Sequence, residues 1–153
     1  MAEGLRRLAG LIAALVLAAC GDGAPAPPDM KDPASIARAF VEAYNAKNLQ
    51  RMLPLHDEVN IDAIAEALDG GPGSEAYERI FVPDMVALLG EQAGAVEGPR
   101  YDGREAIVKV AESGLGDVYT VVLEKGDDDE WIIVAHSMMG AQQFEALPDQ
   151  PRR

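Results

Sequence analysis

The sequence predicts an α+β domain in which helices come first and an antiparallel sheet follows. Two observations support this fold class. Residues 33–44 place apolar side chains at a helical spacing, and residues 105–138 contain segments that alternate or are rich in β-branched residues. Because helices and strands occupy separate parts of the chain, the pattern favours α+β over a parallel α/β sheet. A chain of 153 residues is expected to hold one domain, here over residues 32–147.

The segment before this domain is expected to be a leader and a tether. Arg6 and Arg7 precede an uncharged apolar run over residues 8–19. This run is too short to span roughly 30 Å of hydrocarbon, for which a helix needs about 20 apolar residues. It has the length of the apolar region of a signal peptide. Residues 20–31, rich in Gly, Pro and Ala, then predict a flexible, extended tether.

The end of the apolar run reads Leu17-Ala18-Ala19-Cys20 and resembles the lipobox of bacterial lipoproteins. The resemblance implies that residues 1–19 are a cleaved signal peptide and that Cys20 is lipidated on its thiol and acylated, for example with palmitate, on its new amino terminus. Several acyl chains hold a protein stably at a membrane. The domain would then lie in the bacterial cell envelope, facing the periplasm or the outside. The alternatives are an ordinary secretory signal and a buried helix with a chance Cys.

The composition excludes several functional classes. The 26 acidic and 13 basic side chains give a net charge of −13, which disfavours nucleic-acid binding because that binding depends on neutralising phosphates. Because anionic lipids also repel such an acidic surface, membrane attachment would come from the lipid on Cys20. A single Cys excludes an internal disulfide and a cysteine-cluster zinc site. The acidic run 127–130 lacks the ligand spacing of a calcium loop, and no phosphate-loop or dinucleotide motif is present, so we expect neither a metal nor a cofactor.

The first helix is expected to begin at Pro33, because Asp32 is a good N-cap and Pro is tolerated in the first turn. Ile36, Phe40 and Tyr44 then form one apolar stripe.

The second helical region follows a break at residues 45–48 and a short turn at residues 49–53. Asn60 is expected to cap a helix that ends in the glycine-rich loop 70–73, and Ser74 is expected to begin a third helical stretch.

Strands are expected at residues 105–112, 117–125 and 130–138, with an acidic turn that joins the last two into a hairpin. Residues 141–147 are expected to add a short edge strand, and residues 148–153 to form a frayed tail. The strand at 130–138 is apolar on both faces, whereas a half-solvated strand alternates. We therefore expect its outer face to contact a second copy of the chain or an envelope protein.

The order of these elements resembles the nuclear transport factor 2-like, or cystatin-like, superfamily. Three features carry the resemblance: the helix ARAFVEAYNAKNLQRML at residues 37–53, its polar break at residues 46–49, and the hairpin LEKGDDDEWIIV at residues 123–134. The resemblance implies helices packed on a curved antiparallel sheet, with a pocket on the concave side of the resulting cone. It leaves the function open, because the superfamily includes isomerases, dehydratases and transport adaptors.

Five aromatic residues are the candidates for lining such a pocket: Phe40, Tyr44, Tyr101, Tyr119 and Trp131. The alternative is that these side chains only fill the core.

Neither histidine is expected to be catalytic. If Trp131 faces the helices, simple alternation directs His136 to the opposite face of the sheet. His56 lies beside Asp57 in a loop, where neighbouring residues rarely orient one another for acid–base catalysis. The sequence therefore predicts no catalytic residue.

These features together favour a lipid-anchored, non-enzymatic binding domain whose ligand is a small apolar molecule or an envelope protein. One alternative is an enzyme of the isomerase or hydrolase kind, which would need a buried carboxylate beside a Tyr in the pocket. A second is a structural or chaperone-like envelope factor that uses the outer face of the sheet.

Overall fold

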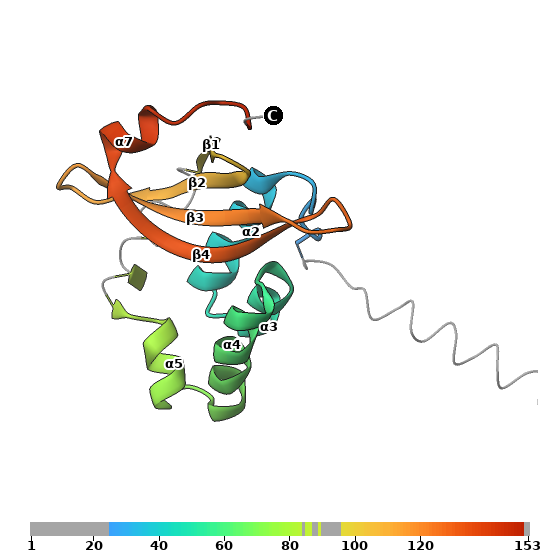
Figure 1. Cartoon of the computed structure of the whole chain (residues 1–153). Coiled ribbons are helices and arrows are strands. Elements are labelled where there is room, and N and C mark those ends of the chain that lie inside the picture. Colours follow the sequence, from blue (N-terminus) through green and yellow to red (C-terminus); the bar gives the residue numbers. More distant parts are fainter. Residues whose placement is uncertain (1–24, 84, 87–88, 90–95, 152–153) are drawn as a thin grey trace, which may run out of the picture.

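A computed structural model of the chain describes residues 25–83, 85–86, 89 and 96–151 (Figure 1). The domain is α+β, as the sequence predicts: helices come first, and an open, four-stranded antiparallel sheet with the order β1-β2-β3-β4 follows. The expected signal peptide, residues 1–19, lies outside the described residues, as do Cys20 and the first part of the tether.

The helices that precede the sheet in the chain lie on one side of it, where α2 crosses it and α4 and α5 extend away from it (Figure 1). They are α2 (Pro33–Asn45), α3 (Leu49–Met52), the short 3-10 turn η1 (Leu53–Leu55), α4 (Glu58–Gly70) and α5 (Glu75–Ile80). The N-cap of α2 is the predicted Asp32, whose side chain accepts a hydrogen bond from the backbone N–H of Ala34. The N-cap predicted for the next helix is wrong: Asp57, not Asn60, caps α4 and accepts from the backbone N–H of Asn60.

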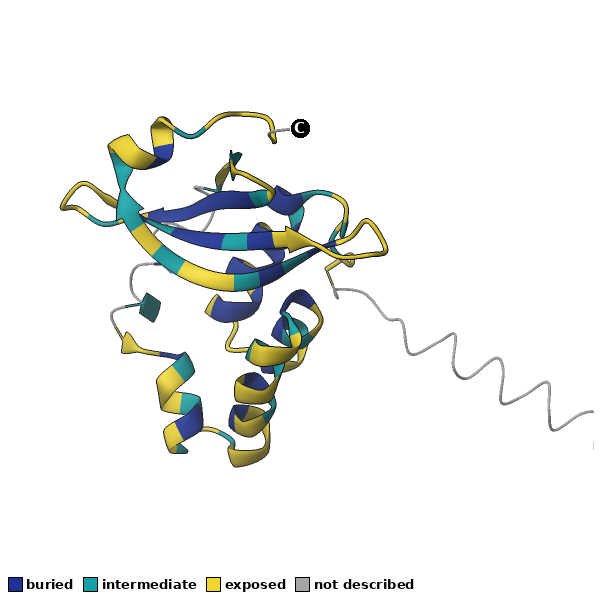
Figure 2. Cartoon of the chain, viewed as in Figure 1, coloured by how far each residue is buried: buried dark blue, intermediate teal, exposed yellow. Residues whose placement is uncertain are grey.

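The main core lies between α2 and the sheet (Figure 2). Ile36 and Ala37 of α2 are fully buried in one cluster with Val108, Val121 and Ile133 of three different strands. Burying a large apolar side chain stabilises a fold by about 1.5–3 kcal/mol. The apolar stripe read from the sequence therefore faces the sheet.

The sheet consists of β1 (Glu97–Asp102), β2 (Glu105–Glu112), β3 (Asp117–Lys125) and β4 (Trp131–Gly140). The last three correspond to the predicted strands. β1 is not predicted by the sequence pattern, because its segment contains Gly98 and Pro99 and does not alternate. Its place at the edge of the sheet explains why it tolerates a Pro, which cannot donate a ladder hydrogen bond.

The edge strand predicted at residues 141–147 is wrong, because this segment contains helix α7 (Ala141–Glu145). Phe144 of α7 is fully buried and packs with Ile107 and Val118 on the face of the sheet opposite to α2. The helix thus covers part of the outer face (Figure 1).

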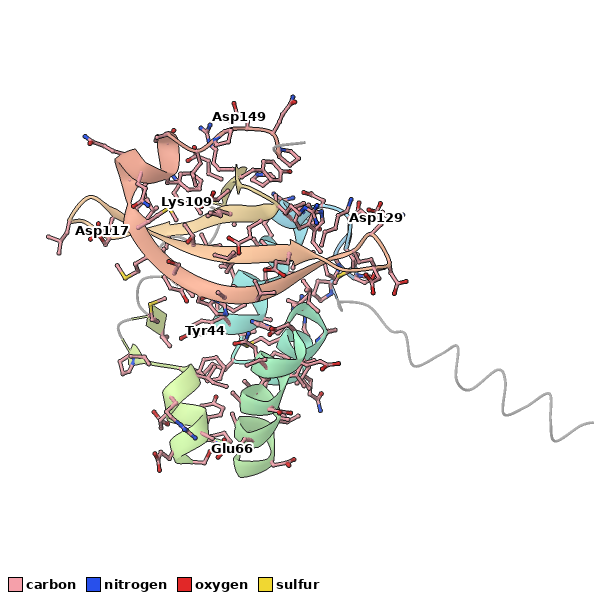
Figure 3. The ribbon with its side chains drawn as sticks, viewed as in Figure 1. Tyr44, Glu66, Lys109, Asp117, Asp129 and Asp149 are labelled. Carbon is pink, nitrogen blue, oxygen red and sulfur yellow. The ribbon has the colours of Figure 1, made fainter. Side chains whose placement is uncertain are left out.

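Pro148 and Asp149, in the tail that the sequence predicts to be frayed, contact β1. The backbone N–H of Tyr101 donates to the carbonyl oxygen of Pro148 at 2.9 Å. Arg100 pairs with Glu145 at 3.1 Å and also with Asp149, which lies above the sheet in Figure 3. These contacts hold the start of the C-terminal segment against the edge strand.

Candidate functional site

A cavity of about 260 Å³ lies between the helices and the sheet. Its lining is mostly apolar and includes Phe40, Met52 and Ile64. The polar members of the lining are Tyr44, His56, Asn60, Arg79, Tyr119 and His136, and no described lining residue is an Asp or a Glu. This volume lies near the lower end of the roughly 300–1,000 Å³ range of ligand pockets, so the cavity suits a small ligand.

The aromatic candidates divide between two places. Phe40, Tyr44 and Tyr119 line the cavity, and Tyr44 lies on the helical side of the sheet (Figure 3). Trp131 lines a separate, wider hollow near the β3–β4 turn. Tyr101 lines neither of these two pockets, and its ring centroid lies 6.3 Å from that of Trp131. The structure therefore does not bring the five residues into one pocket.

His136 faces the helices, so the prediction that it points away from them is wrong. The pairing of β3 with β4 shifts between Val122 and Leu123, which leaves Val134 as an extra residue in β4. This β-bulge interrupts the two-residue alternation. Ile133 before the bulge and His136 after it consequently lie on the same face, and the ring centroid of His136 is 4.9 Å from that of Phe40 on α2.

His56 comes from the segment between η1 and α4, which is attached to β4. The backbone N–H of Asp57 donates to the carbonyl oxygen of Ile133 at 3.0 Å. The His56 side chain is 2% exposed, and its Nδ1 lies 2.8 Å from the carbonyl oxygen of Met52. Because a carbonyl oxygen only accepts, Nδ1 carries the proton and Nε2 of the neutral ring is left with a lone pair.

The two histidines form a direct hydrogen bond. Their Nε2 atoms are 3.2 Å apart and their ring centroids 5.4 Å apart, so the two nitrogens point almost straight at each other. Since Nε2 of His56 has no proton, Nε2 of His136 donates. Nδ1 of His136 then has a lone pair, and it makes no hydrogen bond to any described residue.

Aromatic rings lie beside this pair. Phe40 lies 5.7 Å from His56 and 4.9 Å from His136, between centroids. The ring of Tyr119 is stacked on His136 at an interplanar angle of 12° and a centroid distance of 6.2 Å. The rings restrict the orientation of both imidazoles.

Both histidines are neutral at pH 7. Burial lowers the pKa of His56, although the hydrogen bond to Met52 and the charge of Asp57 act in the opposite direction. Burial, and then repulsion from His56, lowers the pKa of His136 to about 4. His136 is nevertheless an exposed residue of β4, so water reaches the ring and moderates the effect of burial. A second proton on the pair is disfavoured by the first.

The tyrosines of the cavity are neutral hydroxyl groups. The hydroxyl of Tyr44 donates to the carbonyl oxygen of Ile80 at 2.8 Å. Burial raises the pKa of Tyr44 and of Tyr119 to about 12. Neither is therefore a base at pH 7, and the carboxylate required by the Tyr–carboxylate enzyme alternative is missing from the described lining residues.

Comparison of the chain with family models, with curated proteins and with solved structures found no match. Within the described residues, no group of three or more His, Cys, Asp or Glu side chains is placed to hold a metal ion. The helices of this part of the chain are too short or too polar to span a membrane. The geometry of the cavity is thus the basis for a functional proposal.

Proposed function

We propose that this chain is a binding domain for a small, flat and largely apolar molecule that carries one hydrogen-bond donor. The His56–His136 pair is the observation that supports it. The hydrogen bond between the two rings leaves Nδ1 of His136 as an acceptor at the wall of a mostly apolar cavity. A ligand donor would pair with this nitrogen, while burial of the ligand's apolar surface would supply most of the affinity, at about 25 cal/mol per Å².

The charges around the cavity favour a neutral or weakly acidic ligand. The chain as a whole carries a net charge of −13, but the described lining contains Arg79 and two neutral histidines and no carboxylate. Arg79 pairs with Glu66 at 3.4 Å, and both side chains are more than half exposed. Such a surface pair is weak, so Arg79 remains available to a ligand.

The same arrangement supports the resemblance to the nuclear transport factor 2-like superfamily, which we propose as the fold family of the domain. An antiparallel sheet bends around α2, and the cavity lies on the helical side of that sheet (Figure 1).

We further propose that the domain is tethered to the bacterial envelope by a lipid on Cys20, on the basis of the lipobox-like sequence. Cys20→Ser removes the only thiol of the chain and should release the protein from the membrane fraction, because the remaining acidic surface does not bind anionic lipid. Fractionation of cells fed with labelled palmitate measures both effects. A Cys20→Ser protein that stays in the membrane and retains label would overturn the proposal.

The binding site is tested with indole, a bicyclic molecule with one N–H donor. The chain with Cys20→Ser lacks the proposed site of lipid attachment and is used throughout. Indole is expected to shift the amide NMR signals of residues around the cavity, with saturation. Ala63→Trp, which places a large ring at the lining of the cavity, should abolish these shifts.

The matched control is Val59→Trp. Val59 lies on the same helix, is 79% exposed and does not line the cavity, so this variant should bind indole like the parent. Shifts that persist in Ala63→Trp, or that disappear equally in both variants, would show that indole does not bind in this cavity.

A further inference from the structure

We propose that the His56–His136 pair is also a proton relay, which gives the pocket a catalytic activity: removal of an acidic proton from a bound carbon acid. The inference rests on the proposed binding function and adds a reaction to it. The substrate class is a small, flat molecule whose C–H bond is activated by a neighbouring electron-withdrawing group.

The hydrogen-bond directions define the relay. Nδ1 of His136 is the acceptor that a substrate can reach, because His136 is exposed, whereas His56 is 2% exposed. Nε2 of His136 already donates to Nε2 of His56 at 3.2 Å. A proton taken up at Nδ1 of His136 can therefore be followed by transfer of the Nε2 proton to His56.

His56 holds the positive charge better than His136 does. As an imidazolium, His56 would donate from Nδ1 to the carbonyl oxygen of Met52, now 2.8 Å away, and from Nε2 to His136. The carboxylate of the neighbouring Asp57 also favours a charge on His56. His136 is thus the base, His56 is its hydrogen-bonded partner, and the carbonyl oxygen of Met52 orients His56.

The other groups around the pair do not compete for the proton. Tyr44 and Tyr119 are protonated at pH 7, since burial raises the pKa of each hydroxyl. The guanidinium of Arg79, at the lining, would stabilise a developing anion. The described lining offers no carboxylate as an alternative base.

The probe for this activity is 5-nitrobenzisoxazole, whose ring opening reports proton abstraction in an apolar site. The base removes the proton from C3, and the electron pair of that C–H bond forms the nitrile. The N–O bond breaks, and its electron pair leaves on oxygen as a coloured phenolate. The proton from C3 stays on Nδ1 of His136 while the Nε2 proton of His136 moves to Nε2 of His56. When the product leaves, the Nε2 proton returns and the Nδ1 proton is lost to water, so the step needs no other reactant.

The parent chain is expected to open the probe with saturation kinetics. His136→Gln removes the base but keeps a hydrogen-bonding side chain, and should lower kcat/KM by about 100-fold or more. His56→Gln can still accept from His136 and donate to Met52, but cannot take up a proton. It should lower kcat by about tenfold and shift the pH profile, which a purely structural role would not do.

Parallel measurements of indole binding and urea unfolding separate the possible results. If all variants are folded and bind indole, but the parent chain opens the probe no faster than His136→Gln, the relay is wrong and the binding function stands. If the parent binds no indole and shows no probe reaction, both proposals fail. Turnover that is blocked by Ala63→Trp, kept in Val59→Trp and lost in His136→Gln supports the relay.

Discussion

Replacement of Phe40 by Ala is expected to lower the free energy of unfolding by about 3–5 kcal/mol. Phe40 is 2% exposed, and its ring packs against Tyr44, His56 and His136 at centroid distances of 4.9–5.7 Å. These neighbours belong to α2, the loop before α4, and β4. Since a closely packed interior relaxes only in part, the lost ring leaves a cavity that joins the existing pocket. Urea unfolding followed by Trp131 fluorescence measures the loss.

Phe144→Ala is the matched control, because Phe144 is a fully buried Phe on the opposite face of the sheet. It belongs to the five-residue helix α7, which can detach locally without unfolding the main core. Its effect on global unfolding should be smaller than that of Phe40→Ala, and indole binding should be unchanged. Equal losses of stability in the two variants would contradict the view that Phe40 joins the helices to β4.

The parts of the fold that could be predicted are those set by local sequence. The start of α2 follows from Asp32 and Pro33, and its buried face follows from an apolar stripe at helical spacing. β1 could not be predicted in this way, because a segment with Gly98 and Pro99 becomes a strand only by pairing with β2. α7 was mistaken for a strand because burial of Phe144 on the sheet decides its position, and that contact is tertiary.

The site was missed for a related reason. His56 and His136 are separated by 80 residues, and their contact depends on the bulge at Val134. One signal was available in the sequence: Ile132, Ile133 and Val134 are three consecutive apolar residues, which simple alternation cannot place on one face. Counting alternation across such a run assigns every later side chain to the wrong face.

Stability is expected to fall as the pH decreases below about 6.5, the ordinary value for histidine. The folded-state pKa values of His56 and His136 both lie below that value. Between these folded-state pKa values and about pH 6.5, the unfolded chain therefore binds more protons than the folded chain, so the free energy of unfolding rises with pH. Above about pH 6.5 the contribution of the histidines to stability is fully present. The slope is limited to about 1.4 kcal/mol per pH unit for each histidine. Urea unfolding from about pH 8 to about pH 5 measures it, above the range where carboxylates titrate.

The histidine variants identify the source of this slope, because His56→Gln and His136→Gln each remove one titrating ring. Each should reduce the pH dependence, and the double variant should be nearly flat between about pH 7 and about pH 5. At pH 7 the two single losses of stability should not add, with a coupling of about 0.5–3 kcal/mol, because the rings share one hydrogen bond. A slope that survives in the double variant would assign the pH dependence to other groups. Additive losses would show that the Nε2–Nε2 hydrogen bond contributes nothing to the folded state.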